Sequence, residues 1–144
     1  MFSFWKKEKI PFQIEDEWIG FYRYIGTNIA NRDNLKVKFH AFINGNTSSF
    51  NGTITEDVST GGIAESSTIS GYIKGNKIIF EKRYKNNHFY NEYGESFTVF
   101  DEGEHIVNYK GYFDKKKNLF WGTWEIFDNY TSGYWEMKRA VQDQ

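Results

Sequence analysis

The sequence of 144 residues contains no cysteine, so neither disulfides nor thiolate metal ligands can contribute to its fold. Its 18 basic and 19 acidic residues give a net charge of -1, which excludes the basic surplus typical of nucleic-acid binders. No stretch approaches the roughly 18 apolar residues of a membrane helix. The first residues also lack the charge order of a signal peptide. We therefore expect a cytoplasmic protein without a membrane span or a nucleic-acid partner.

Proline is almost absent, with one residue against 13 glycines, whereas aromatic residues make up 20% of the chain. Aromatic residues favour strands, and scarce proline leaves backbone N–H groups free for sheet ladders. Alternating apolar and polar residues predict strands joined by short turns, such as those at Gly45 and Gly75. Residues 85–101 are compatible with an extra strand or with an irregular excursion, so eight or nine strands are predicted.

Five predicted strands share one pattern, a glycine with a large apolar residue two positions before it and two positions after it. These glycines are Gly20, Gly52, Gly71, Gly111 and Gly122. Residues two apart share a face of a strand, so each glycine lies between two bulky groups. We expect this where a strand bends sharply or where a neighbouring ring needs space, as in a small closed barrel. The sequence therefore predicts an all-β fold, an antiparallel up-and-down β-barrel rather than an open sandwich.

One domain is predicted over residues 18–139, with an N-terminal extension at 1–17 and a short tail at 140–144. The extension combines three aromatic residues with three lysines within its first nine positions. Such a segment can contact a membrane surface or a partner groove. Because it is too short to bind strongly alone, we expect it to pack across one end of the barrel as a lid.

Short motifs in the first and last strands resemble those of the calycins, which are the lipocalin, fatty-acid-binding and avidin-like barrels. The motifs are Trp18-x-Gly20-x-Tyr22, Phe120-x-Gly122-x-Trp124 and Gly133-x-Trp135-x-Met137-x-Arg139. The chain is similar over residues 18–139 to small bacterial domains of this type. The resemblance implies a barrel that binds a small hydrophobic molecule in its interior, without naming the molecule.

The resemblance also implies roles for individual residues. In closed calycin barrels an arginine near the end of the last strand often stacks over the first-strand tryptophan and closes one end. Arg139 and Trp18 are the corresponding residues, which implies a structural cation–π contact, with ligand contact as the alternative for Arg139. Lys82 and Arg139 are candidates by position for the basic pair with which fatty-acid binders hold a carboxylate. The biotin-contacting residues of avidins have no counterpart that can be assigned.

The predicted inward faces nominate candidates for the lining of a ligand cavity. The candidates are Phe39, Phe50, Phe80, Lys82, Tyr84 and Trp124. Lys82 is unusual among them, because a buried cation is costly unless it is paired. It predicts either an internal carboxylate or ligand anion beside it, or a position near a barrel mouth where the ammonium group reaches water.

Three functions are compatible with such a barrel. The leading hypothesis is a non-enzymatic protein that binds a small hydrophobic molecule. The second is an interaction module that presents exposed aromatic residues such as Phe42, Tyr72 and Tyr134 to a partner or to another copy of the chain. The third follows from the resemblance, because some lipocalin-like barrels are isomerases or decarboxylases.

For an enzyme of that kind, Tyr84, Lys82 and Glu125 would be the residues to inspect. The three histidines are scattered along the chain, at His40, His88 and His105, without metal-ligand spacing. No metal, cofactor or catalytic triad is therefore predicted.

Overall fold

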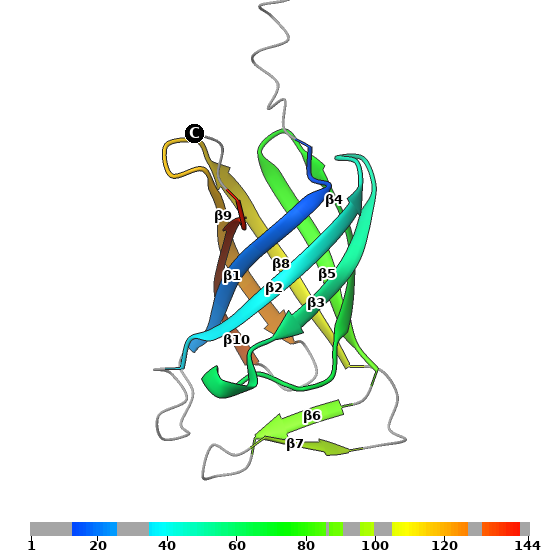
Figure 1. Ribbon diagram of the computed structural model, residues 1–144, viewed down its shortest axis with the longest axis vertical. Helices are drawn as coiled ribbons and strands as arrows, with labels where there is room; N and C mark the ends of the chain where they lie inside the picture. The colour runs from blue at the N-terminus through cyan, green and yellow to red at the C-terminus, as the bar shows by residue number, and fades with distance from the viewer. Residues whose placement is uncertain are drawn as a thin grey trace, which may run out of the picture.

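The computed structural model describes residues 13–25, 35–85, 87–90, 96–99, 105–126 and 131–141. For residues 87–90 and 96–99 it describes the backbone alone. Eight antiparallel strands form a closed barrel in the order β1-β10-β9-β8-β5-β4-β3-β2 (Figure 1). They are β1 (Asp16–Ile25), β2 (Val37–Gly45), β3 (Phe50–Glu56), β4 (Ser67–Lys74), β5 (Lys77–Tyr84), β8 (His105–Asp114), β9 (Leu119–Ile126) and β10 (Thr131–Arg139). The predicted all-β up-and-down barrel is confirmed.

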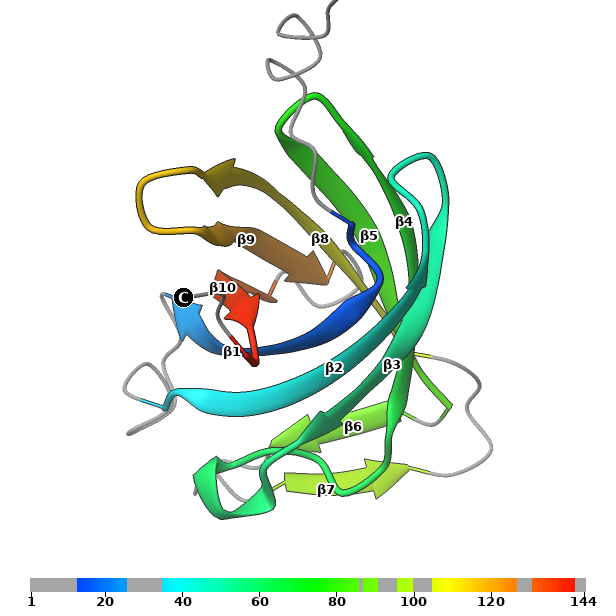
Figure 2. The same cartoon turned by 45° about the horizontal axis from the view of Figure 1, so that its top comes forward.

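Residues 85–101, for which the sequence allows an extra strand or an irregular excursion, contribute no strand to the barrel. Its strands β6 (Asn87–Tyr90) and β7 (Ser96–Val99) pair with each other in a separate two-stranded sheet. This small sheet lies near the short 3-10 helix η2 (Val58–Thr60), at one end of the barrel, in both views of the molecule (Figures 1 and 2). The barrel therefore has eight strands rather than nine.

The connections between strands differ at the two ends of the barrel. At the end that we call the hairpin end, tight turns at 46–49, 75–76 and 115–118 join successive strands. At the opposite end, the loop-bearing end, the connections span 26–36, 57–66, 85–104 and 127–130. Among the described residues, the longest connection, 57–66 with the 3-10 helix η2, lies at the loop-bearing end (Figure 1).

The repeated glycines lie where strands and rings approach one another most closely. Gly111 of β8 and Gly122 of β9 are cross-strand partners. A Cβ at Gly122 would overlap a carbonyl oxygen of β8, and a Cβ at Gly111 would lie 2.9 Å from Cζ2 of Trp135. A Cβ at Gly20 would likewise lie 2.7 Å from Cζ of Phe39. Glycine therefore leaves space for a neighbouring ring, as predicted, and it also permits close approach of the backbones.

The interior at the hairpin end is apolar. Trp18 packs on Phe120 with ring centroids 5.5 Å apart, and Phe120 in turn contacts Phe113 at 5.0 Å. Ile14 and Met137 are buried in the same cluster. Since burying such side chains is the main favourable contribution to folding, this end forms a conventional hydrophobic core.

Candidate functional site

The interior at the loop-bearing end contains a buried ion pair. Nζ of Lys82 on β5 lies 2.7 Å from Oε2 of Glu56, the last residue of β3. Lys82 is 1% exposed and Glu56 is 4% exposed. Strand β4 lies between β3 and β5, so the pair links strands that are not adjacent. Two charges withdrawn from water in this way are stable only with full hydrogen bonding.

Glu56 receives that hydrogen bonding from three other groups. The Tyr22 hydroxyl donates to Oε1 at 2.7 Å, and the backbone N–H of Ile63 donates to the same atom at 3.0 Å. The Tyr84 hydroxyl donates a short hydrogen bond to Oε2. The carboxylate therefore ties β1, β5 and the 57–66 connection to the end of β3.

Tyrosine rings surround the ammonium group of Lys82. Its Nζ lies 4.6 Å from the ring centroid of Tyr22, 4.9 Å from that of Tyr84 and 5.7 Å from that of Tyr109. These distances permit cation–π attraction, which is stronger in a desolvated site. The cation is thus held by one carboxylate and by three aromatic faces.

The cluster shifts the pKa values of its members in opposite directions. Burial raises the pKa of Glu56, but the charge of Lys82 and the hydrogen bonds hold it below its usual value. Burial lowers the pKa of Lys82, and the Glu56 carboxylate offsets only part of that effect. Burial, followed by the charge of Glu56, raises the pKa of both Tyr84 and Tyr109 well above the usual value. Both tyrosines therefore keep their protons.

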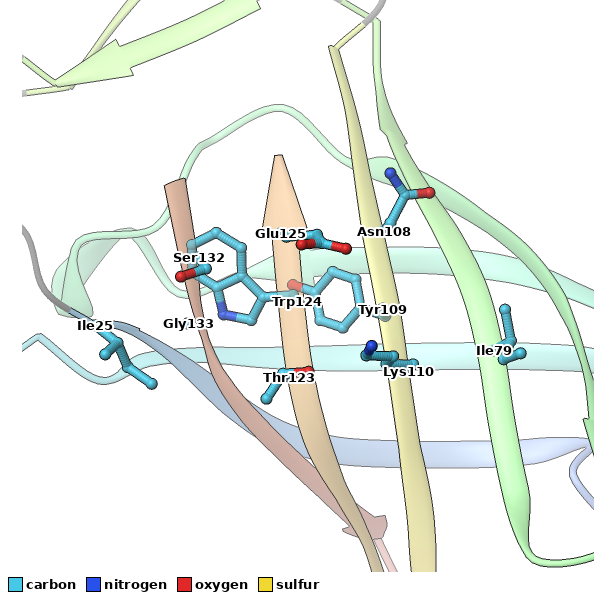
Figure 3. A pocket seen from close by; sticks show the side chains of 10 residues that line it. All are labelled: Ile25, Ile79, Asn108, Tyr109, Lys110, Thr123, Trp124, Glu125, Ser132 and Gly133. Atoms are coloured by element: carbon cyan, nitrogen blue, oxygen red, sulfur yellow. The ribbon is translucent and has the colours of Figure 1, made fainter. Parts of the chain in front are cut away.

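Tyr109 is held rigidly at the edge of this cluster. Its ring stacks on Phe80 with centroids 4.7 Å apart and an interplanar angle of 14°, and it meets Trp135 edge-on at 5.6 Å. Figure 3 shows the ring extending from β8 toward β9, with its hydroxyl end beside Trp124. Tyr109 is 3% exposed.

All six nominated lining residues are buried in the interior. They are Phe39, Phe50, Phe80, Lys82, Tyr84 and Trp124. Lys82 and Tyr84 bond to Glu56 directly, and Phe80 supports Tyr109. Phe39 is the cross-strand partner of Glu56, whereas Phe50 meets Phe80 edge-on at 6.3 Å. Their contact with a ligand stays a prediction.

Of the two alternatives for Lys82, the structure shows the internal carboxylate: Glu56 pairs with Lys82 inside the barrel, and Lys82 does not reach water at a barrel mouth. Glu56 is not among the candidates predicted from the sequence, although its signal is present: Phe50, Gly52, Ile54 and Glu56 alternate onto one face of β3. Extending the glycine pattern by one more step would have found the carboxylate.

Glu125 was considered together with Tyr84 and Lys82, but it does not join them. Its neighbours Trp124 and Ile126 are buried, so Glu125 alternates onto the outer surface of β9. There it lines a hollow of about 330 Å³ together with Asn108 and Ser132 of the flanking strands (Figure 3). The carboxylate beside the two interior residues is Glu56 instead.

Arg139 and Trp18 meet at the hairpin end. The guanidinium carbon lies 4.8 Å from the centroid of the Trp18 ring, and the side chain also bonds to Asp16 at 2.5 Å and to the carbonyl of Gln13 at 3.0 Å. Residues 1–12 of the expected lid lie outside the described residues. In the part that follows, Ile14 is fully buried and its carbonyl accepts a hydrogen bond from the Trp18 indole.

In the described parts of the chain, no group of three histidine or carboxylate side chains could hold a metal ion. His40 forms a surface pair with Glu17 at 3.0 Å. Among the same residues, no helix has the length and the apolar character needed to cross a bilayer.

Comparison with known proteins adds no assignment. Neither protein-family models nor curated proteins nor solved structures yield a match to this chain.

Proposed function

We propose that this chain is a non-enzymatic binding protein that takes up a small, largely apolar molecule at the loop-bearing end of the barrel interior. The observation that carries the proposal is the buried cluster of Glu56, Lys82 and tyrosine hydroxyls at that end. Aromatic walls with a few fixed polar groups are the usual chemistry of a small-molecule site.

The contrast between the two ends supports this location. The hairpin end is closed by tight turns, by Trp18 and by Arg139. A barrel that needed only stability could fill the opposite end with apolar side chains as well, because replacing a buried ion pair by packed apolar groups is often neutral or stabilising. The polar cluster therefore points to a task other than stability.

Native mass spectrometry of the protein purified from its own host tests the proposal. We expect a small molecule to be retained and to be released on denaturation. The variant Trp124→Leu, at the polar cluster, should reduce the retained fraction, because the ring next to Tyr109 is lost. The matched control Phe120→Leu changes the same face of β9 at the hairpin end and should leave retention unchanged. A protein with no retained mass in any preparation would contradict the proposal.

A protein-interaction module is the second candidate, favoured by aromatic residues on the outer surface. Phe42 is 49% exposed and Tyr72 is 44% exposed. Tyr134 is half-buried, because it lies between Phe21 and Arg23. Light scattering over a range of concentrations tests this function. Association of the wild type that Phe42→Ser and Tyr72→Ser abolish would favour it, whereas a strict monomer with no partner would count against it.

A further inference from the structure

We propose that the barrel admits its ligand by opening between β3 and β4 at the loop-bearing end, and that the carboxylate of Glu56 is the latch that holds this opening closed. The inference rests on the proposed binding function and adds the route by which a ligand reaches the interior. The observations that carry it are a short ladder between these two strands and the hydrogen bonds that bridge them beyond its end.

The side chains around the proposed site are closed off from solvent. Lys82 is 1% exposed and Tyr84 is 4% exposed. Ile63 of the connection 57–66 is 9% exposed and belongs to the same buried core. A ligand that contacts the polar cluster therefore requires an element at this end of the barrel to move.

The ladder between β3 and β4 is the shortest in the barrel. It has five residue pairs and ends at Ile54 and Ser67, whereas the other ladders have seven or eight pairs. Past that point β3 continues beside β2 as far as Glu56. The hydroxyls of Thr55 and Ser66 lie 3.4 Å apart, beyond the usual O–H···O range. Because so few bonds hold these strands together, we expect local opening to begin here.

Three hydrogen bonds on Glu56 bridge the same place. The Lys82 ammonium group and the Tyr84 hydroxyl, both on β5, donate to Oε2 and thereby join β3 to the far side of β4. The backbone N–H of Ile63 donates to Oε1 at 3.0 Å and holds the connection 57–66 against the carboxylate. Hydrogen bonds to an ionised group are stronger than neutral ones, so one carboxylate compensates for the short ladder.

The two halves of the connection 57–66 are held by different parts of the barrel. In the first half, the N–H of Asp57 donates to the carbonyl of Lys38 on β2 at 2.8 Å. In the second half, the carboxylate of Glu65 accepts a hydrogen bond from the N–H of Lys85, which follows β5, at 2.8 Å. The halves are therefore attached to opposite sides of the proposed opening.

A reversible crosslink across the opening tests the route. The chain has no cysteine, so a variant with both Thr55→Cys and Ser66→Cys forms one intramolecular disulfide at two exposed positions. N-phenylnaphthylamine is a neutral probe whose fluorescence rises in apolar surroundings, and stopped-flow mixing measures its uptake. We expect the oxidised variant to take up the probe about tenfold more slowly than the reduced variant. The dissociation constant should not change, because a barrier slows uptake and release equally.

A variant with both Lys110→Cys and Thr123→Cys is the matched control. These residues are exposed cross-strand partners on β8 and β9, so their disulfide locks a different ladder. Oxidation of this variant should leave the uptake rate unchanged. Each variant is compared with its own reduced form, so the comparison does not depend on its stability relative to wild type.

Two tyrosine variants test the latch. Tyr84 and Tyr22 both donate to Glu56, but Tyr84 does so from β5, across the opening. Tyr22 lies on β1, which is connected to β3 through β2 on one side of the opening. Tyr84→Phe should raise the rate of probe uptake about tenfold, because one hydrogen bond to a carboxylate no longer opposes opening. Tyr22→Phe should leave the rate close to the wild-type value.

Exchange of the Ile63 amide hydrogen provides a measurement that needs no ligand. This N–H donates to Glu56, so we expect it to exchange when the connection leaves the carboxylate. The disulfide at positions 55 and 66 should slow this exchange, and the control disulfide should not. Equal exchange in the oxidised and reduced forms of the first variant would overturn the proposed opening.

The outcomes separate the route from the binding function. If the probe does not bind the wild type, the proposed function fails, and the route fails with it. If the probe binds but the disulfide at positions 55 and 66 leaves its uptake rate unchanged, ligands enter elsewhere, and the inference is overturned while the binding function stands. If Tyr84→Phe and Tyr22→Phe change the rate equally, Glu56 is not the latch.

Discussion

The two ends of the barrel interior use different chemistry on the same strands. At the hairpin end, Trp18 and Phe120 pack as a hydrophobic core, and the charged Arg139 lies over the Trp18 ring. At the loop-bearing end, the charges of Glu56 and Lys82 lie inside. Apolar packing needs no partner of a particular kind, whereas a buried charge needs one specific partner. We therefore expect sensitivity to mutation and to pH to be concentrated at the loop-bearing end.

The largest effect is expected from breaking the buried pair. Glu56→Gln or Lys82→Met alone should lower the free energy of unfolding by about 3–5 kcal/mol, because each leaves an uncompensated buried charge. The double variant should lose about 2 kcal/mol less than the sum of the single losses. Urea denaturation measures all three values. Additive losses would show that the pair is not coupled, and the two ends would then not differ in this respect.

Acid should act on the same end. The pKa of Glu56 in the folded protein lies below the usual 4.5, so its stabilising contribution is fully present above that pH. The contribution is lost as the pH falls through the lowered value, because Lys82 then becomes an unpaired buried cation. Urea denaturation at a series of pH values between about 7 and about 3 should show this loss in the wild type.

The variant with both Glu56→Gln and Lys82→Met serves as the control for the acid experiment. It lacks the titrating pair, so its stability should depend less steeply on pH in the acid range. Equal slopes for the two proteins would assign the acid sensitivity to other carboxylates.

A smaller effect is expected from Arg139 at the hairpin end. Arg139→Gln removes the cation–π contact with Trp18 and the ion pair with Asp16. Because the guanidinium group is partly solvated, we expect a loss of about 1–2 kcal/mol, with no change in acid sensitivity relative to wild type above pH 4.5. A loss as large as that of Lys82→Met would mean that charge matters equally at both ends. Thermal unfolding of the three proteins side by side measures the difference.

The smallest effect is expected from trimming the apolar core. Ile78 is fully buried next to the β4–β5 turn, and Ile78→Val removes one methylene group. We expect a loss of about 0.5–1.5 kcal/mol that does not depend on pH. Measuring the free energy of unfolding at neutral and acid pH provides the check, and a pH-dependent loss would contradict the proposed separation of the two ends.

Much of the fold was accessible from local patterns because the physical constraints are local. Alternation identified the inward face, on which Phe39, Phe80 and Trp124 lie. The glycine repeat predicted closure because a Cβ at these positions would collide with a neighbouring strand or ring, as at Gly122. Both signals arise from the geometry of a single strand and its immediate neighbours.

The candidate site was only partly accessible, because it depends on non-adjacent strands. Lys82 signalled that a counter-charge was needed, but Glu56 lies on β3, which β4 separates from β5, so no pattern within one strand identifies the pair. The side of the strand on which Glu125 lies was predictable from its neighbours, and testing it against the alternation would have excluded that residue. The pairing of β6 with β7 has no comparable periodic signal in the sequence.

The order of the strands along the chain has a consequence for synthesis. The groups that bond to Glu56 lie between Tyr22 and Tyr84, so they leave the ribosome before β8, β9 and β10. The hairpin-end core needs Phe120 and Met137, and it cannot form until β10 pairs with β1. A nascent chain without β10 has two free sheet edges, β1 and β9, which are hazards for pairing with other chains. Pairing of β1 with β10 is therefore the folding step after which the barrel no longer exposes these edges to other chains.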